Sequence, residues 1–439
     1  MKRIYIILLA SLVLTTACNN DLDQFPDNIA SSDSLTNFES VLYAAYFYQL
    51  GGATPMAVMG DFRADNALMQ EAPYTDFDEY NSSLVSMEDQ FFGPFYTAMY
   101  KSILSANIVI ENSEDSSDIA EAKFLRALSY FKLVRVFGGV TINLSDAPST
   151  TDTSILERAS SADVYAQVVA DLMDAIAGLD NSEISTGRAS QLAAQALLGK
   201  VYVQMGEFGS AETYLAAAVN AASGAGISLQ ASFSDIFGSA NDLNSEIIFA
   251  SQVSSSIADE YTFASEFTDW YSGGDTKSQQ PLDSDLADAF DAAGDTTRKD
   301  LTIDGATCIK YGGADPDQDW IELRLADVIL LYAETLNENN NASGAQSATI
   351  LALLDDIRTR AGLASLVGTA TSQDDVRDAI LNERRLELAF EGQRWFDLVR
   401  TGTVNEEMGE TISSDYYLFP LPVSEINSTN GVITQNSGY

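Results

Sequence analysis

The chain has 439 residues, 46% of them apolar, which is enough to bury one large core or the cores of roughly two to three ordinary domains. Its 64 acidic and 23 basic side chains leave a net charge of -41, which argues against a nucleic-acid partner and favours a neutral ligand. The absence of histidine excludes serine–histidine and cysteine–histidine catalysis and histidine-ligated zinc.

The first residues predict a secretory lipoprotein signal. Two basic residues precede an apolar run over residues 4–14, which is too short to span a bilayer as a mature helix, and small residues lead to Cys18. Leu14 lies four positions before Cys18, where lipoprotein signals usually have leucine three before it. We expect residues 1–17 to be removed and Cys18 to carry the lipid anchor. The alternative is a conventional signal with an incidental cysteine.

Three stretches in the first third of the chain have apolar residues at helical spacing, namely residues 33–50, 90–112 and 121–140. The third is expected to end at Gly138, because glycine commonly terminates helices. Residues 51–88 contain two prolines and many polar side chains, so they are predicted to be mostly loop.

Residues 195–218 match a tetratricopeptide helix pair, with Gly199 on the first helix and Gly206 at the turn. The small or apolar positions expected on the second helix are Ala211, Leu215 and Ala218. A weaker unit starts at Tyr332 and places Ala345 and Ala352 on its second helix. Since one repeat cannot bury its own face, we expect several helix pairs.

Helical spacing is lost over residues 225–320, where short strand-like runs occur at 246–251 and 307–311. A loop-rich region of this length within a compact protein is usually functional or disordered, and its aromatic residues favour a functional role. Helical spacing resumes over residues 321–338.

Residues 382–400 predict a helix, a turn at Gly392 and a second helical start. They carry four acids and four arginines and are therefore neutral within a very acidic chain. We interpret these charges as partly buried and paired with one another, with Trp395 in the core, because arginine binds carboxylates bidentately. The alternative is a catalytic carboxylate pair or a sugar site around Trp395.

The pattern E-R-R-x-E-x-x-F-E-G-x-R-W-x-D-L-x-R over residues 383–400 resembles the C-terminal hallmark of the SusD/RagB family. The helix at 121–140, the helix at 321–338 and the closing stretch LFPLPVSEINSTNGVITQNSGY also resemble that family, with Ser437 where proline is usual. Members are glycan-binding, or in some cases peptide-binding, outer-membrane lipoproteins of Bacteroidetes nutrient-uptake systems.

The resemblance implies a mostly α fold of tetratricopeptide-type helix pairs with a loop-rich insert carrying short strands. We divide the chain into the signal (1–17), an N-terminal helical part (18–225) and a C-terminal part (226–439), which comprises the insert (226–320), helices (321–400) and a tail. Members of the family bind their ligands without catalysing a reaction, so we expect that this chain is not an enzyme. It would sit on the cell surface, anchored in the outer membrane, and pass an oligosaccharide to a SusC-like TonB-dependent transporter.

A glycan site needs exposed aromatic rings flanked by polar side chains. Trp270 and Tyr271 in the insert are the first candidates, followed by Trp320, Tyr74 and Tyr80. The alternative for Trp270 is that it only packs the insert onto the helices. A very acidic surface suits a high-salt habitat such as seawater, where salt screens the surface charges. A neutral marine glucan such as laminarin is therefore a candidate ligand.

No cofactor or catalytic residue is predicted, and Cys308 is expected to be a buried free thiol. Asp315, Asp317 and Asp319 alternate as in a calcium loop, but Trp320 takes the place of the turn glycine, so only a non-standard site stays open. The rival functions are a peptide receptor, a glycoside hydrolase using two of the many carboxylates, and a structural repeat scaffold.

Overall fold

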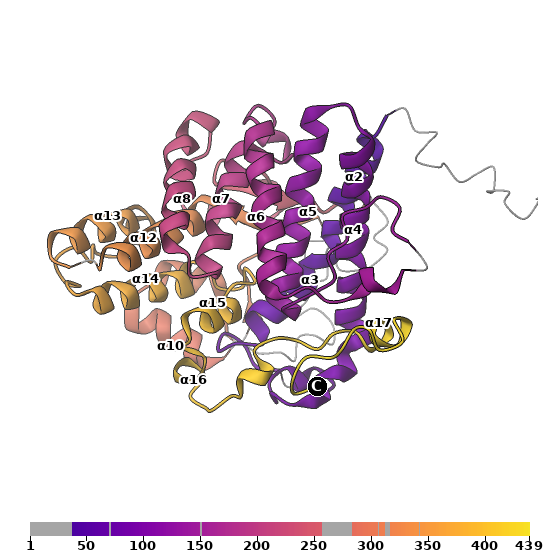
Figure 1. Cartoon of the computed structure of the whole chain (residues 1–439). Coiled ribbons are helices and arrows are strands. Elements are labelled where there is room, and N and C mark those ends of the chain that lie inside the picture. The colour runs from indigo at the N-terminus through magenta and orange to yellow at the C-terminus, as the bar shows by residue number, and fades with distance from the viewer. Residues whose placement is uncertain are drawn as a thin grey trace, which may run out of the picture.

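The computed structural model describes residues 37–69, 72–149, 152–256, 283–305, 307–311, 317–341 and 343–439. Most of the described chain is helical, and the long helices from α2 to α8 stand side by side in chain order (Figure 1). The first six are α2 (Glu39–Gln49), α4 (Gly93–Asn112), α5 (Ser116–Phe137), α6 (Ser161–Gly178), α7 (Gln191–Gln204) and α8 (Phe208–Ala222). The later ones are α12 (Leu325–Asn340), α13 (Ala345–Arg360), α14 (Gln373–Glu387) and α15 (Arg394–Thr401).

These helices form a stack in which each packs against its neighbours. Contacts run from α2 to α4, α5, α6, α7 and α8, then to α12, which also packs on α13 and α14. Helix α5 lies inside the stack, and nearly all its side chains from Ala120 to Phe137 are buried. It begins at the Asp115 carboxylate, which accepts hydrogen bonds from the first backbone N–H groups, and ends at Gly138 with φ of 72°. The expected end of this helix is confirmed.

The first tetratricopeptide unit is confirmed as the pair α7 and α8. Ala211, Leu215 and Ala218 are buried, and a Cβ on Gly199 would lie 2.5 Å from the Leu215 side chain. Glycine at this position therefore lets the two helices approach closely.

The second unit exists as α12 and α13, but its predicted register is wrong. Ala345 and Ala352 are exposed, whereas Ile350, Leu351 and Leu354 are buried. Because α13 packs against α14 as well as α12, larger aliphatic side chains fill the space between them.

The predicted loop at 51–88 is wrong at its start. Residues 50–62 form consecutive helical turns, η3 (Leu50–Gly52), α3 (Ala53–Ala57) and η4 (Val58–Phe62), and all are buried. Pro55 lies in the first turn of α3, where backbone N–H groups make no hydrogen bond within the helix, so the lack of an N–H in proline costs nothing there. The rest holds the short turns η5 (Tyr74–Phe77), η6 (Ser82–Met87) and η7 (Glu88–Phe92).

In the described part of the region predicted to lack helices there are two, α10 (Ser284–Ala293) and α11 (Thr296–Thr302). Asp283 and Asp295 each cap one of them by accepting backbone N–H bonds. An aspartate at each helix start is a local sequence signal for a helix, and it is independent of apolar spacing.

Two short antiparallel pairs cross the same region. Strand β1 (Ile247–Ser251) pairs with β4 (Trp320–Arg324), and β2 (Ile303–Asp304) pairs with β3 (Thr307–Cys308). Residues 321–324 were predicted to begin a helix, but α12 starts only at Leu325. A short apolar run buried on both faces has the same composition in a strand and in a helix, so spacing alone does not separate them.

The remaining elements are the helices α16 (Val404–Glu407) and α17 (Val423–Ser428) and the turns η8 (Thr153–Leu156), η9 (Ile184–Thr186), η10 (Ser223–Ala225), η11 (Phe233–Asp235), η12 (Ser239–Asn241) and η14 (Ser414–Tyr416). Cys308 is a free, buried thiol, as expected. Within the described ranges, none of the helices has both the length and the apolar character needed to cross a bilayer. The signal and Cys18 lie outside those ranges.

Candidate functional site

The charged segment at 382–400 is buried and ion-paired, as predicted. Glu387 is fully buried at the end of α14 and lies 2.7 Å from both Arg298 and Arg324, and 2.5 Å from Arg360. Burial raises the pKa of Glu387, but the three arginines outweigh it and bring the pKa down to about 2. A carboxylate held ionised in this way is unsuited to act as a general acid near neutral pH.

The pairing differs from the prediction in one respect, because most partners lie outside the segment. Arg384 pairs with Asp327 at 2.7 Å, and Arg394 pairs with Asp65 at the same distance. Asp397, which binds both Arg384 and Arg400, is the carboxylate that pairs within the segment. A helix, turn and helix direct their side chains toward several neighbouring elements, so local neutrality does not require local pairing.

Trp395 belongs to the core, as predicted. Its side chain is fully buried, its indole N–H donates to the Tyr417 carbonyl at 3.2 Å, and Tyr80 stacks on it at 5.8 Å. The Trp395 ring is therefore closed to a ligand in this arrangement.

Three of the predicted ligand-stacking residues lie in the described ranges, and none presents an open ring. Trp320 is 2% exposed in β4 and Tyr74 is 9% exposed beside Phe91. Tyr80 is partly buried, stacks on Trp395 and contacts the Arg63 guanidinium, and its hydroxyl donates to the Arg63 carbonyl. Apolar packing takes up these rings, so they are unavailable as platforms in this arrangement. Trp270, Tyr271 and Asp315 lie outside the described residues.

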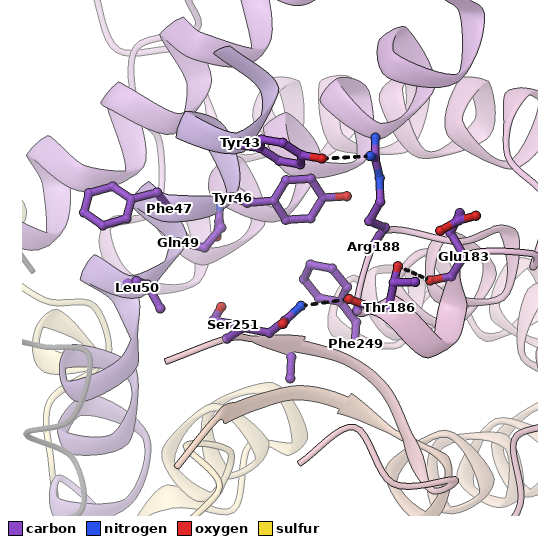
Figure 2. A pocket seen from close by; sticks show the side chains of 13 residues that line it. Tyr43, Tyr46, Phe47, Gln49, Leu50, Glu183, Thr186, Arg188, Phe249 and Ser251 are labelled. Atoms are coloured by element: carbon purple, nitrogen blue, oxygen red, sulfur yellow. Dashed lines mark hydrogen bonds between the residues drawn. The ribbon is translucent and has the colours of Figure 1, made fainter. Parts of the chain in front are cut away.

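An aromatic and polar cavity of about 480 Å³ lies at one end of α2 (Figure 2). Its lining comes from three segments that are distant in sequence: α2, the turn at residues 183–188 and the end of β1. The side chains with rings or polar groups in the lining are Tyr43, Tyr46, Phe47, Gln49, Glu183, Thr186, Arg188, Phe249, Ser251 and Gln252.

Tyr43 gives this cavity an accessible ring. Half of its side chain is exposed, more than for any other aromatic residue in the described ranges. Its hydroxyl donates to Glu39 at 2.8 Å and accepts from Arg188 at 3.4 Å, and Figure 2 shows it pointing toward Arg188. The bond to Glu39 raises the pKa of Tyr43, so the phenol stays protonated. An open ring with a hydroxyl at its edge suits the apolar face and hydroxyls of a sugar.

The cation of the cavity is already neutralised. Arg188 donates to Glu121 through Nε at 3.0 Å and Nη2 at 2.7 Å, and lies within 4 Å of Asp118 and Glu39. Its hydrogen bonds to Glu121 raise the pKa of Arg188. The exposed Glu183 adds a further carboxylate, so the charged side chains at this wall are one cation and four anions.

The floor of the cavity depends on a glycine. Gly187 has φ of 81°, and a Cβ there would lie 2.0 Å from the Gln252 side-chain nitrogen. Gln252 in turn donates to the Thr186 carbonyl at 3.1 Å. Glycine therefore permits both the left-handed turn and the close approach that brings the turn against the end of β1.

Our sequence reasoning missed this cavity. A signal existed, because Tyr43, Tyr46 and Phe47 follow helical spacing and form an aromatic stripe beside the apolar positions Leu42 and Ala45. Nothing in the sequence, however, indicated that residues 183–188 or the end of β1 would face this stripe.

Comparisons with known proteins agree with this architecture. A model described as the SusD family matches residues 260–412, and one described as starch-binding associating with outer membrane matches residues 18–203. A SusD-like protein of Formosa agariphila is 24% identical over an alignment that covers 100% of both chains. The chain belongs to the SusD family. The resemblance noted in residues 383–400 is thereby confirmed.

Solved SusD structures share this fold over nearly the whole chain. A laminarin binding SusD-like protein is 25% identical with a TM-score of 0.71, and the match covers 92% of this chain and 99% of that one. A SusD superfamily protein from Parabacteroides distasonis has a TM-score of 0.76 at 21% identity, covering 92% and 100%. Of the cavity residues of this SusD-family chain, Tyr43 and Arg188 lie in the N-terminal matched range, and Gln252 lies between the two ranges.

Proposed function

We propose that this SusD-family protein is a non-enzymatic receptor that binds a neutral oligosaccharide in the Tyr43 cavity. The observation that carries the proposal is the half-exposed Tyr43 ring beside the Thr186 hydroxyl and the Gln252 amide, within about 480 Å³. Aromatic stacking with a few placed polar groups is the usual means of binding a sugar.

The charges at the cavity favour a neutral ligand. Arg188 is neutralised by Glu121, and Glu183 faces the same space with no side-chain partner in the described ranges. A uronate or sulfated glycan would meet net negative charge from the described residues of this cavity, whose one arginine is already paired.

Laminarin is the ligand we would test first. A structural neighbour at 25% identity is named as laminarin binding, and laminarin is an uncharged glucan. Trp270 and Tyr271, which begin 18 residues after Gln252, are proposed as additional contacts. Lipid attachment at Cys18 would hold the receptor on the outer membrane, where it would hand the glucan to a SusC-like TonB-dependent transporter.

Affinity electrophoresis and calorimetry with laminarin test the proposal. The wild type and Tyr202→Ala, which removes a tyrosine stacked on Tyr214 outside the cavity, should bind equally. Tyr43→Ala should weaken binding on the order of tenfold through lost stacking, with an unchanged Tm. If Tyr43→Ala and the wild type bind laminarin with equal affinity, the proposal that laminarin binds in the Tyr43 cavity is wrong.

Two further assays separate the rival functions. Reducing ends should not accumulate when the wild type is incubated with laminarin, and turnover above background would indicate a hydrolase instead. A panel of peptides should show no binding at concentrations that saturate laminarin, and the reverse result would indicate a peptide receptor.

A further inference from the structure

Two groups of buried ion pairs, counted apart from the pairs that Arg385 and Arg394 form with Asp65, differ in charge balance. The group around Glu387 is balanced, with five cations and five carboxylates: Arg298, Lys310, Arg324, Arg358 and Arg360 with Glu246, Asp295, Glu383, Glu387 and Glu391. The group around Asp327 pairs three cations with three carboxylates: Lys200, Arg384 and Arg400 with Asp327, Glu334 and Asp397. The Lys132–Glu322 pair and Arg135 adjoin this group, because Arg135, Lys200 and Glu322 line one cavity, and with them the group has five cations and four carboxylates. The second group therefore carries one excess positive charge.

Arg135 of α5 is the cation left over. It is 9% exposed, and its Nε is buried without a hydrogen-bond acceptor. Its guanidinium lies between two rings, 4.4 Å from the centre of Phe131 and 4.6 Å from that of Phe396. Among the described residues no carboxylate forms an ion pair with it. Arg63 also lacks a carboxylate and a partner for its Nε, but its two other guanidinium nitrogens donate to backbone carbonyls.

Arg135 lines a small internal cavity. Lys200, Glu322 and Gln393 supply its other polar side chains, and Met56, Leu128 and Trp320 are among the apolar ones. The cavity leaves about 10 Å³ for the centre of a water-sized particle. That is enough for one water molecule or one monatomic ion and too little for sulfate or phosphate.

We propose that this cavity binds one chloride ion, held by the Arg135 guanidinium and the nearby Lys200 ammonium. A halide is the class of ligand that combines a single negative charge with a size close to that of water. It would cancel the one excess charge of the Asp327 group and accept the hydrogen bond that Arg135 Nε lacks.

The two lysines and Glu322 are already engaged, which leaves Arg135 as the group that needs an anion. Lys200 lies 2.9 Å from Asp327, and Lys132 pairs with Glu322, which also accepts from Ser251 at 2.8 Å. Glu322 thus faces the cavity with its charge compensated by Lys132. Burial lowers the pKa of Arg135 to about 10 and outweighs Tyr165, Glu322, Asp327 and Asp397, which raise it without contacting the guanidinium in an ion pair.

Bromide provides a direct test on the wild-type chain. Crystals soaked in sodium bromide and measured near the bromine absorption edge should show an anomalous peak inside the cavity, beside the Arg135 guanidinium. A peak there supports the proposal. Ordinary water density with no anomalous signal in the cavity overturns it, wherever else bromide binds.

Solution stability gives a second measurement, since a ligand that binds only the native state raises the Tm. At equal ionic strength, the wild type should unfold on the order of 2 °C higher in sodium chloride than in sodium gluconate, whose anion is too large for the cavity. Equal Tm values in the two salts would contradict a stabilising ion.

Variants assign the effect to Arg135. Arg135→Gln should lose both the bromide peak and the difference between chloride and gluconate. Arg377→Gln, at an arginine that is 33% exposed and pairs with Glu338, should keep both. If Arg135→Gln does not fold, the two wild-type measurements still decide, and a bromide peak that persists in a folded Arg135→Gln would overturn the assignment.

Discussion

The ion-paired core around Glu387 and the cavity around Tyr43 use charge in opposite ways. In the core, Glu387 is fully buried and each of its oxygens contacts at least one arginine. At the cavity wall, Arg188 is partly exposed, its carboxylate partners outnumber it, and Glu183 faces solvent. The most recognisable pattern of the sequence thus holds the fold together, whereas the ligand site that we propose lies in residues that this pattern does not include.

The largest effect expected is on stability, from removing the central carboxylate of the core. Glu387→Ala leaves Arg298, Arg324 and Arg360 with one partner fewer inside the protein. Because unpaired buried charges are strongly unfavourable, it should lower the free energy of unfolding by about 3–5 kcal/mol, measured by urea denaturation.

Glu338→Ala is the matched control, because it also breaks an ion pair with arginine, to the more exposed Arg377. Glu338→Ala should lower the free energy of unfolding by about 0–1 kcal/mol. If the two variants lose the same stability, the buried pairs do not hold the fold in the way described.

A second test reshapes the cavity without changing charge. Gly187→Ala adds a Cβ that would lie 2.0 Å from Gln252, in a backbone conformation with φ of 81°. Gly206→Ala imposes comparable backbone strain at φ of 74° but meets nothing within 4 Å. Both should lose about 1–2 kcal/mol of stability, and only Gly187→Ala should also weaken laminarin binding, measured by calorimetry. Equal binding by both would show that the turn does not shape the site.

The pH dependence of stability distinguishes Glu387 from Asp319. The pKa of Glu387 is depressed to about 2, so its contribution is present above the unfolded pKa of about 4.3 and is lost as the pH falls toward 2. Burial raises the pKa of Asp319 to about 7, so the unfolded chain ionises this group first and stability falls as the pH rises from about 4 to 7.

Asp319→Asn should therefore become more stable relative to the wild type as the pH rises through that window. The asparagine oxygen can still accept the bond from the Val253 N–H, which is 2.8 Å long in the wild type. Urea denaturation at pH 4, 5.5 and 7.5 measures the difference, and a difference that does not change with pH would contradict the raised pKa.

The smallest effect expected is on ligand charge selection. Laminarin in which some primary hydroxyls are oxidised to carboxylates should bind several-fold more weakly than native laminarin at low salt, and the gap should narrow as salt rises. Glu183→Gln should reduce the gap, because it removes the exposed carboxylate of the cavity. Equal binding of both polymers at low salt would mean that the wall does not select by charge.

Much of the fold could be predicted because its signals are local. The helical spacing that ends at Gly138 corresponds to α5 and its end, and the repeat at 195–218 corresponds to α7 and α8. Predictions failed where burial on both sides removed the spacing, as in β4, and where a proline was taken for a loop signal, as at Pro55 in α3.

The candidate site could not be predicted in the same way. Tyr43 and Arg188 are 145 positions apart, and their contact depends on the stacking of α2 against helices that come later in the chain. Trp320 illustrates the converse, because its sequence context left open whether it would be exposed, and pairing of β4 with β1 buries it.

The sequence by itself determined the helical architecture, the family and the presence of a buried set of arginines and acids, since each of these is written in residue types at short spacing. Tertiary structure alone decided which acid pairs with which arginine, which rings stay open and that Arg135 has no carboxylate partner among the described residues. Those outcomes depend on the packing of segments that are distant along the chain, and burial, which packing sets, controls the strength of every charge interaction.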